Sequence, residues 1–296
     1  MNIFEEINKK ILCGDGAMGT MLHRMGLKEG VCPESFNKDF PDTVRKISEL
    51  YRDAGSDFIS TNTFGANSFK LSEYDCENMT EEYNILGAEI AKSVMGNKGF
   101  VFASCGTTGQ ILEEEGGFAT AEEIYTSFAR QTKAQALGGA DGILIETQYS
   151  KYESSIAIKA AKDSTGLPVA CTFAFEKGRR GFRTMMGLSI TDAIQSAIEA
   201  GADIVGANCG NGIENMAEIC KEIRQVTGRP ILINSNAGVP ALENGETVFR
   251  TAPEEIAKYV PDLINAGANI IGGCCGTTPE HIKAMYEVIC NFNTKQ

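Results

Sequence analysis

The sequence predicts an α/β fold, a single (β/α)8 TIM barrel made from residues 1–296, on three observations. Eight short apolar runs of strand length recur along the chain, and each is followed by a stretch with helical periodicity. Four of these runs belong to one repeated unit, and the other four lie between its copies. At this length, strict strand–helix alternation over eight units favours one closed barrel over a doubly wound sheet or two smaller domains.

The repeated unit marks every second strand. In each copy a helix is expected to end at glycine, an acidic or amide residue follows, and a short apolar run comes next. A Thr or Cys stands six residues after that Asp or Asn, at the end of the run. The four copies read AGSDFISTNT (54–63), GGADGILIET (138–147), AGADIVGANC (200–209) and AGANIIGGCC (266–275).

The remaining elements complete the alternation. Strands are expected in ILCGDG (11–16), FVFASCG (100–106), VACTFAF (169–175) and ILINSNAG (231–238). Helices are expected at 42–54, 80–96, 120–137, 152–164, 190–200, 214–227, 253–266 and 279–290. Thr80, Thr120 and Thr278 precede acidic residues and are predicted N-caps. Pro253 and Pro279 suit the first turn of a helix.

Composition and charge disfavour several classes of protein. The chain has 43% apolar and 22% charged residues, which is ordinary for a soluble globular protein. Its net charge of −12 disfavours nucleic acid and anionic membrane surfaces as partners. Residues 1–10 lack the apolar core of a signal peptide, and no apolar run reaches the length of a membrane span. With ten cysteines in so long a chain, the sequence predicts a cytoplasmic protein with free thiols, not a secreted disulfide scaffold.

Three cysteines that end two of the repeated runs form the strongest candidate site. On a barrel, the loops after the strands build the catalytic face. Cys209 ends one run, Cys274 and Cys275 end another, and Asn236 ends the strand expected between them. Three thiolates with an exchangeable fourth position describe an open zinc site. The alternatives are three buried cysteines that pack as small hydrophobic residues, or a vicinal disulfide.

The other cysteines and the two histidines are expected to have no catalytic role. His23 and His281 are interpreted as solvated or capping residues. The other seven cysteines fall in predicted strands (Cys13, Cys105, Cys171), helices (Cys220, Cys290) and loops (Cys32, Cys76).

Taken together, the motifs resemble the homocysteine S-methyltransferase family. This family includes the zinc-binding homocysteine module of cobalamin-dependent methionine synthase and the betaine– and S-methylmethionine–homocysteine methyltransferases. GGCCGTTPEH with an upstream Asn-Cys is the most specific signal. The segments that carry the resemblance are GDGAMGTML (14–22), TNTFGAN (61–67), IETQYS (145–150), GANCG (206–210), SNAGVP (235–240) and GGCCGTTPEHI (272–282). The resemblance implies an enzyme that binds Zn2+ through Cys209, Cys274 and Cys275.

The resemblance also implies how the amino acid substrate is held. Asp15 and Glu146 match the family's acidic groups for the substrate ammonium, and two carboxylates suit a cation. The alternatives are that Asp15 forms a turn and that Glu146 is the buried partner of an arginine.

The first loop and two amides complete the expected substrate contacts. The backbone amides from Gly16 to Thr20 match the loop that receives the substrate carboxylate, and a glycine-rich turn that enters a helix suits an anion. The amides counted as substrate contacts are those of Gly16, Ala17, Gly19 and Thr20. Asn236 matches an amide that approaches the zinc when no thiol is bound, and Asn62 is a further expected contact. The alternative for Asn236 is an ordinary residue that closes a turn.

The implied reaction is methyl transfer to homocysteine, giving methionine. A free thiol with a pKa of ~8.5 is mostly protonated near neutral pH, and zinc lets it bind as a thiolate. The methyl donor is expected to be a separate methylcorrinoid (cobalamin) protein or a small onium compound such as S-methylmethionine. Betaine is disfavoured because the chain has no Trp for an aromatic cage. The loop 176–189, with Arg179, Arg180 and Arg183, is expected either to grip the donor or partner or to be simply solvated.

Departures from the family's pattern leave alternatives open. GTTG (106–109) stands where the family commonly has Gly-Pro-x-Gly, and CGNGIEN (209–215) and ETQYS (146–150) also differ. The main alternative is therefore a corrinoid-protein-coupled methyltransferase of one-carbon metabolism with a different methyl substrate or acceptor. The third hypothesis is a non-catalytic barrel with a structural or sensory zinc.

Overall fold

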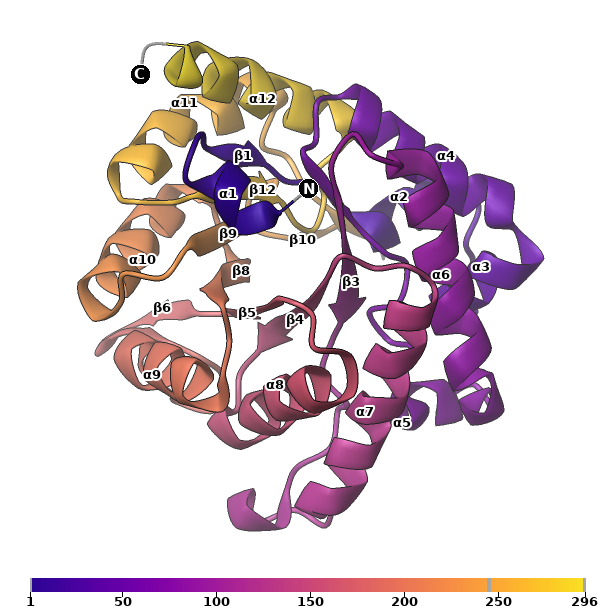
Figure 1. The fold of residues 1–296 in the computed structure, drawn as a ribbon. Helices are drawn as coiled ribbons and strands as arrows, with labels where there is room; N and C mark the ends of the chain where they lie inside the picture. Colours follow the sequence, from indigo (N-terminus) through magenta and orange to yellow (C-terminus); the bar gives the residue numbers. More distant parts are fainter. Residues whose placement is uncertain (1, 244–245, 295–296) are drawn as a thin grey trace.

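The computed structural model, which describes residues 2–243 and 246–294, is a barrel of parallel strands ringed by helices (Figure 1). The strand order is β1-β12-β9-β8-β5-β4-β3-β2, so the predicted fold class is confirmed. Each barrel strand overlaps a predicted one. The strands are β1 Leu12–Cys13, β2 Phe58–Ser60, β3 Phe100–Cys105, β4 Gly142–Gln148, β5 Val169–Phe173, β8 Ile204–Gly212, β9 Ile231–Asn236 and β12 Ile270–Gly273.

Helices of the predicted ranges form the outer layer, because each buries an apolar face against the outward-facing side chains of the strands. Each of them lies within about one turn of its expected bounds. They are α4 Pro41–Asp53, α6 Thr80–Met95, α7 Ala121–Leu137, α8 Lys151–Thr165, α9 Ile190–Ala200, α10 Ile213–Val226, α11 Pro253–Asn265 and α12 Pro279–Asn293.

The helix starts follow the sequence signals with one exception. Thr120 caps α7 with a full capping box, and Pro253 and Pro279 open their helices. Thr278 caps α12 together with His281, which confirms the capping interpretation of that histidine. The prediction for Thr80 is wrong: it is the first residue of α6, because a 3-10 turn runs directly into the helix and Met79 takes the cap position.

Short elements that the sequence did not reveal fill the loops. They span too few residues to show a periodicity. The segment expected as a loop at 176–189 contains a hairpin, β6–β7. The short elements are α1 Ile3–Ile7, α2 Met18–Arg24, η1 Pro33–Ser35, α3 Phe36–Asp39, α5 Ser68–Ser72, η2 Glu77–Met79, η3 Glu113–Glu115, β6 Glu176–Gly178, β7 Gly181–Arg183, β10 Ala241–Glu243 and β11 Glu246–Val248.

The barrel interior is apolar at one end and polar at the other. Helix α1 covers the amino-terminal end in Figure 1, where Ile3 and Ile7 join one apolar cluster with a residue from every barrel strand. Two positions further along a strand the side chain points to the same face. There the residues are polar: Ser60 follows Phe58, and Glu146 follows Leu144. The sequence therefore places an apolar core at the amino-terminal end of the barrel and a polar chamber at the carboxyl ends of the strands.

The repeated Asp or Asn joins each strand of the repeated units to the strand before it. Its side chain accepts the N–H of a residue in the preceding strand, and its own N–H donates to that residue's carbonyl. A Lys or Arg holds the same side chain. The four side-chain acceptor pairs are Asp57 with Cys13, Asp141 with Val101, Asp203 with Val169, and Asn269 with Ile231. The pair of Asp57 and Cys13 also joins β2 to β1, the two ends of the strand order.

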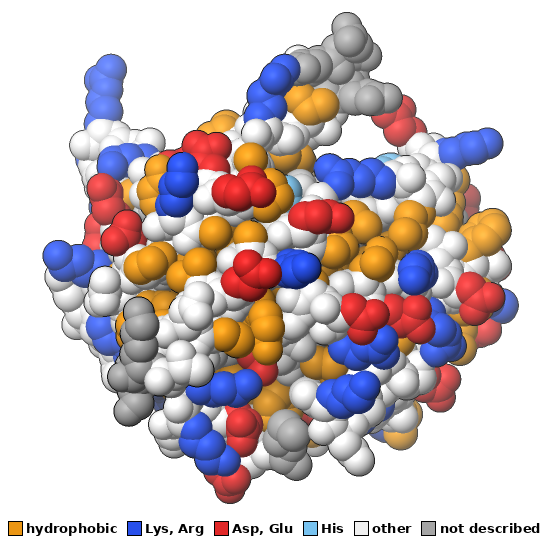
Figure 2. Space-filling view, turned by 90° about the horizontal axis from the view of Figure 1, so that it is seen from above, with side chains coloured by type: hydrophobic (Ala, Val, Ile, Leu, Met, Phe, Trp, Pro, Cys, Tyr) orange, Lys and Arg blue, Asp and Glu red, His pale blue; other side chains and the backbone are white. Residues whose placement is uncertain are grey.

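The surface mixes charges of both signs. On the side where α12 lies, Figure 2 shows acidic and basic side chains interspersed with apolar ones. None of the helices in the described ranges combines the length and apolar character that a membrane span needs. The cytoplasmic location stays a prediction.

Candidate active site

The three cysteines predicted to bind metal come together at the carboxyl end of the barrel. Their sulfur atoms all lie within 4.8 Å of one another, and Cys209 Sγ is 3.9 Å from Cys275 Sγ. Cys209 lies in β8, while Cys274 and Cys275 directly follow β12, and β9 lies between these strands. All ten cysteines are free thiols, so the vicinal disulfide is absent here.

The geometry and the donor set fit a zinc ion. Two sulfurs at roughly 2.3 Å from a tetrahedral zinc would be about 3.8 Å apart, close to the observed separation of Cys209 and Cys275. Thiolates are the soft ligands that zinc accepts. Asn236 Oδ1 is buried and has no hydrogen-bond partner among the described residues, so a polar group remains free beside the sulfurs. Such an unpaired oxygen is expected where a ligand binds.

The thiols form one hydrogen-bonded cluster with unequal acidities. Hydrogen bonds from Cys274 and Cys275 lower the pKa of Cys209, with smaller contributions from Gly210 and Asn236. The same contacts, with Cys209 as the acceptor, raise the pKa of Cys274 and of Cys275. Two S–H donors next to Cys209 thus favour a thiolate within this cluster.

The backbone at the site is strained at two matching positions of the repeat. Cys209 and Thr147 have φ values of 57° and 58°, in the left-handed region that non-glycine residues rarely adopt. Each such residue costs on the order of 1–3 kcal/mol and persists only where its surroundings hold it. Gly210 also has a positive φ, and a Cβ there would lie 2.5 Å from the carbonyl oxygen of Phe175. The turn after Cys209 therefore requires glycine.

The two acidic residues predicted to bind an ammonium both lie at this end of the barrel. Asp15 is buried, and its Oδ2 accepts hydrogen bonds from the N–H and the hydroxyl of Ser60, each at 2.7 Å. Glu146 accepts a hydrogen bond from the Ser104 hydroxyl. Among the described residues, neither carboxylate has an ion-pair partner, so the arginine interpretation of Glu146 is not supported.

Burial controls the protonation of these two groups. Loss of water around Asp15 raises its pKa to about 7, against the lowering effect of the Ser60 hydrogen bonds. Desolvation also raises the pKa of Glu146 to about 7, and the nearby charges of Asp15 and Cys209 add to it. A cation placed between two such carboxylates would favour their charged forms.

The glycine-rich loop, residues 14–17, runs between β1 and α2, and contacts with α4 and with the loop after β12 hold it in place. Tyr51 lies within hydrogen-bond distance of the carbonyl oxygens of Ala17 and Thr277. A Cβ on Gly16 would come within 2.8 Å of that ring and of Thr277, so only glycine fits. The N–H of Ala17 donates to Thr277 Oγ1, which leaves it less available to a carboxylate. Among the residues that the structure describes, no side chain caps α2, and the space around Gly19 is open.

Two further predicted contacts have different surroundings. Thr20 Oγ1 is buried and has no hydrogen-bond partner in the described part of the chain. Asn62 donates both amide hydrogens, to the Pro33 carbonyl at 2.8 Å and to Asn37 Oδ1 at 3.0 Å. Its side chain thus holds the first loop, and its role in substrate binding stays a prediction.

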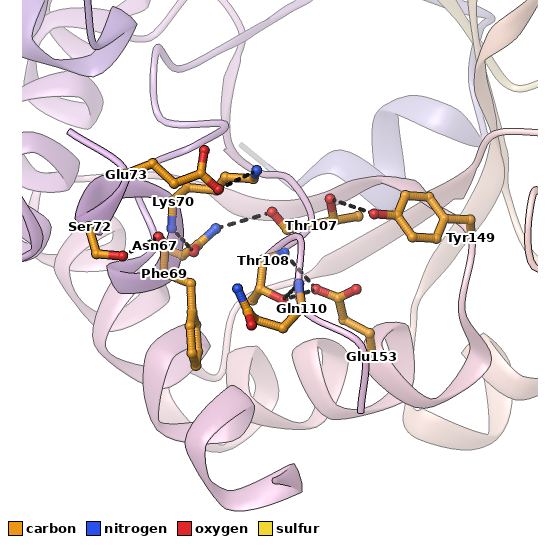
Figure 3. Close-up of polar contacts among 10 residues, drawn as sticks. All are labelled: Asn67, Phe69, Lys70, Ser72, Glu73, Thr107, Thr108, Gln110, Tyr149 and Glu153. Atoms are coloured by element: carbon orange, nitrogen blue, oxygen red, sulfur yellow. Dashed lines mark hydrogen bonds and ion pairs between the residues drawn. The ribbon is translucent and has the colours of Figure 1, made fainter. Parts of the chain in front are cut away.

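The loop after β3, where the sequence departs from Gly-Pro-x-Gly, is held from two sides (Figure 3). Glu153 of α8 accepts hydrogen bonds from the N–H and the hydroxyl of Thr108, at 2.6 and 2.7 Å. Asn67 donates to the carbonyl of Thr107, and the Tyr149 hydroxyl reaches Thr107 Oγ1. Side-chain hydrogen bonds therefore hold the backbone of this loop where the family commonly has proline.

The arginines of the 176–189 segment fall into two groups. Arg179 and Arg180 lie exposed at the turn of the β6–β7 hairpin. Arg183 donates to the carbonyl of Gly187 and so holds its own loop. The 3-10 turn Glu113–Glu115 is also held at this rim, because Glu115 accepts a hydrogen bond from Ser150 at the start of α8.

Three residues of the site escaped the sequence analysis. Ser60 and Ser104 orient the carboxylates, and Asn208 contacts Cys274 Sγ at 3.7 Å. All three continue the inward-facing, period-two positions of their strands above the apolar core, and this alternation is the signal that would have identified them.

Comparison with known proteins agrees with this arrangement. The family model described as homocysteine S-methyltransferase matches residues 12–289. Curated methionine synthases of Mycobacterium tuberculosis and Mycobacterium leprae are 30% and 28% identical over 98% and 99% of the chain. The chain spans only about a quarter of the length of these relatives, 26% and 25%.

Solved structures share the fold. The metallated form of the homocysteine methyltransferase of Escherichia coli superimposes with a TM-score of 0.78 at 20% identity, over 94% of this chain and 96% of that chain. A dihydrodipicolinate synthase of Bacillus anthracis, at 15% identity, gives a TM-score of 0.54 over 96% of this chain and 76% of that chain. The likeness to the methyltransferase confirms the predicted TIM barrel. Because the family match covers the whole barrel, the chain belongs to the homocysteine S-methyltransferase family of enzymes.

Proposed function

We propose that this protein is a zinc-dependent S-methyltransferase that methylates homocysteine to methionine, with residues 1–296 acting as one domain. The observation that carries the proposal is the cluster of Cys209, Cys274 and Cys275, with three sulfurs within 4.8 Å at the polar end of the barrel. Three protein ligands leave a fourth tetrahedral position for a substrate thiol. Family membership supports the reaction class, and a metallated form of the E. coli enzyme of the same fold supports a metal.

The chain's own residues bind and orient the substrate in this proposal. Asp15 and Glu146 receive the ammonium, and the open first turn of α2 receives the carboxylate. Bound zinc would supply the Lewis acidity that keeps the substrate thiol ionised at neutral pH. The homocysteine sulfur then forms a bond to the donor's methyl carbon. The bond between this carbon and the rest of the donor breaks, and its electron pair stays with the donor. No protein base is needed, since the thiol has already lost its proton.

The rim of the barrel supports delivery of the methyl group by a separate corrinoid protein, or entry of a small onium donor. Most of the large exposed apolar side chains lie in loops that follow strands, on the same end as the cysteines. They include Met25, Val31, Phe64, Ile111, Phe118, Met185, Met186, Val239 and Leu242. An apolar rim with the exposed Arg179 and Arg180 suits a protein partner.

A corrinoid-coupled enzyme with a different acceptor is the second candidate. It is favoured by the β3 loop, whose GTTG sequence is fixed by Glu153 and Asn67 in place of the family's proline. This loop borders the side from which a donor would enter, so a change in its shape alters the space next to the thiol.

A donor panel tests the proposed function. The reduced, zinc-loaded protein is assayed for methionine formation from homocysteine with S-methylmethionine, and separately with a methylcorrinoid. We expect turnover with at least one donor, loss of both zinc and activity in Cys209→Ala, and no such loss in the control Cys76→Ala. Full activity in Cys209→Ala would contradict the proposal. Activity only with another acceptor would favour the second candidate.

A further inference from the structure

Asn208 is a buried side chain that connects four strands of the site. It lies in β8, immediately before Cys209, and is fully inaccessible to solvent. Its Oδ1 accepts hydrogen bonds from the N–H of Thr147 in β4 at 2.8 Å and from the Thr172 hydroxyl in β5 at 2.7 Å. Its Nδ2 donates to Thr147 Oγ1 at 2.8 Å and to Cys274 Sγ, after β12, at 3.7 Å.

The orientation of this amide is fixed by its partners. A backbone N–H can only donate, so the atom facing Thr147 N must be the oxygen of Asn208. The nitrogen then has to face Cys274. All four hydrogen-bonding positions of the amide are used, which leaves it no alternative arrangement inside the barrel.

The same side chain borders both strained residues. Asn208 directly precedes Cys209, which has a φ of 57°. It also forms hydrogen bonds with the backbone and the side chain of Thr147, which has a φ of 58°. Thr147 directly follows Glu146, so these hydrogen bonds also fix the strand end that carries this carboxylate. One amide thereby links the thiol cluster to a proposed ammonium site.

We propose that Asn208 is a positioning residue: it orients the Cys274 thiolate through an N–H···S hydrogen bond and holds Thr147, and with it Glu146, at a fixed place relative to the three sulfurs. The inference rests on the proposed function, because it assigns Asn208 to the metal centre of that site. Hydrogen bonds to a metal ligand fix the orientation of the ligand atom and reduce the negative charge on it.

Asn208→Asp isolates the contact with sulfur. An aspartate keeps an oxygen for Thr147 N and Thr172, and the Thr147 hydroxyl can turn to donate to its second oxygen. It has no N–H for Cys274. We expect metal affinity, measured by chelator competition, to fall about 10–100-fold, and the sulfur-to-cobalt charge-transfer band of the cobalt-loaded protein to shift. Thr172→Val, which removes one bond to the same amide and keeps N–H···S, is the matched control and should retain the wild-type band.

A second measurement tests the link to Glu146. Homocysteine and 4-mercaptobutyrate, which lacks the ammonium, are titrated into the cobalt-loaded proteins and followed by the same band. We expect Asn208→Asp to lose part of the preference for homocysteine. Asn208→Ala, which places no charge beside the sulfurs, should weaken metal binding in the same direction and serves if the aspartate variant does not fold.

The outcomes separate this inference from the proposed function. Wild-type metal affinity, band position and ligand preference in both folded Asn208 variants would overturn the inference alone. A wild-type protein that binds no metal when reduced would overturn the proposed function and this inference with it.

Discussion

Two carboxyl groups, the buried Asp15 and the half-buried Glu146, make substrate binding depend on pH. Each has a pKa of about 7 because burial disfavours its charged form, so both are largely neutral at pH 6 in the free site. An ammonium binds the charged forms, and its binding therefore releases protons. We expect homocysteine affinity to rise as pH increases through 7, by up to about tenfold per pH unit below the pKa for each carboxyl that must ionise.

The measurement is the Kd of homocysteine in the metal-loaded protein between about pH 6 and about pH 8, beside that of 4-mercaptobutyrate. Both ligands carry a thiol and a carboxylate, so the difference between their pH profiles reports the ammonium site. Identical profiles would contradict the assignment of Asp15 and Glu146.

Replacing Glu146 by Gln gives a second test of this assignment. The amide can still accept the hydrogen bond from Ser104 but carries no charge for an ammonium. We expect homocysteine binding to weaken about 10–100-fold, the loss of one charge-assisted hydrogen bond, while 4-mercaptobutyrate binds as before. Glu153→Gln, at a glutamate whose contacts go to Thr108, is the control and should leave homocysteine binding nearly unchanged.

Individual residues of the site were predictable from sequence where their chemistry is rare. Thiols at the ends of two repeated strands stand out, and Cys209, Cys274 and Cys275 do converge. Ser60, Ser104 and Asn208 are common polar residues, and only their contacts in three dimensions distinguish them from surface residues. The positive φ of Thr147 could not be foreseen either, since a β-branched residue is a poor choice for that conformation.

At the scale of elements, the repeated Asp or Asn explains why the repeated units can be recognised at all. At the amino-terminal rim, the side-chain oxygen of each accepts the N–H of a residue in the preceding strand, in place of a backbone carbonyl. This requires an acceptor oxygen at one fixed place. The repeat thus joins neighbouring strands, and at Asp57 it joins the two ends of the strand order. The repeated residues at this end of the barrel serve stability, while chemistry lies at the other end.

Asp141 is the position at which we test this role. Its carboxylate accepts the N–H of Val101 at 2.9 Å and pairs with Lys92 at 2.6 Å. Asp141→Ala leaves the N–H of Val101 without its acceptor, and we expect the free energy of unfolding to fall by about 1–3 kcal/mol. Asp141→Asn, which reproduces the arrangement at Asn269, should cost less. Chemical denaturation of the metal-free proteins measures both, and equal losses would contradict the proposed role of the acceptor oxygen.

The long elements were predictable because their periodicities extend over many residues, as in α7 and β4. The short ones were not. Helix α1 closes the bottom of the barrel with only Ile3 and Ile7, and the β6–β7 hairpin spans three residues on each side. Their structure depends on contacts with the barrel, so local sequence carries little of the information.

At the scale of the whole molecule, the barrel separates stability from chemistry. The apolar cluster that Ile3 and Ile7 of α1 form with the barrel strands closes one end, and the polar chamber with the three sulfurs lies at the other. The loops around that chamber carry the exposed apolar rim, and the chain corresponds to about a quarter of the methionine synthases it matches. This division lets the donor side vary, by loop sequence or by partner, without disturbing the thiol site.

The most direct test is zinc-edge X-ray absorption on the purified, reduced protein before and after homocysteine is added. We expect about one zinc per chain, held by three sulfurs and one lighter atom in the free protein and by four sulfurs in the complex. A protein that takes up no zinc, or one whose sulfur count does not change with homocysteine, would contradict it.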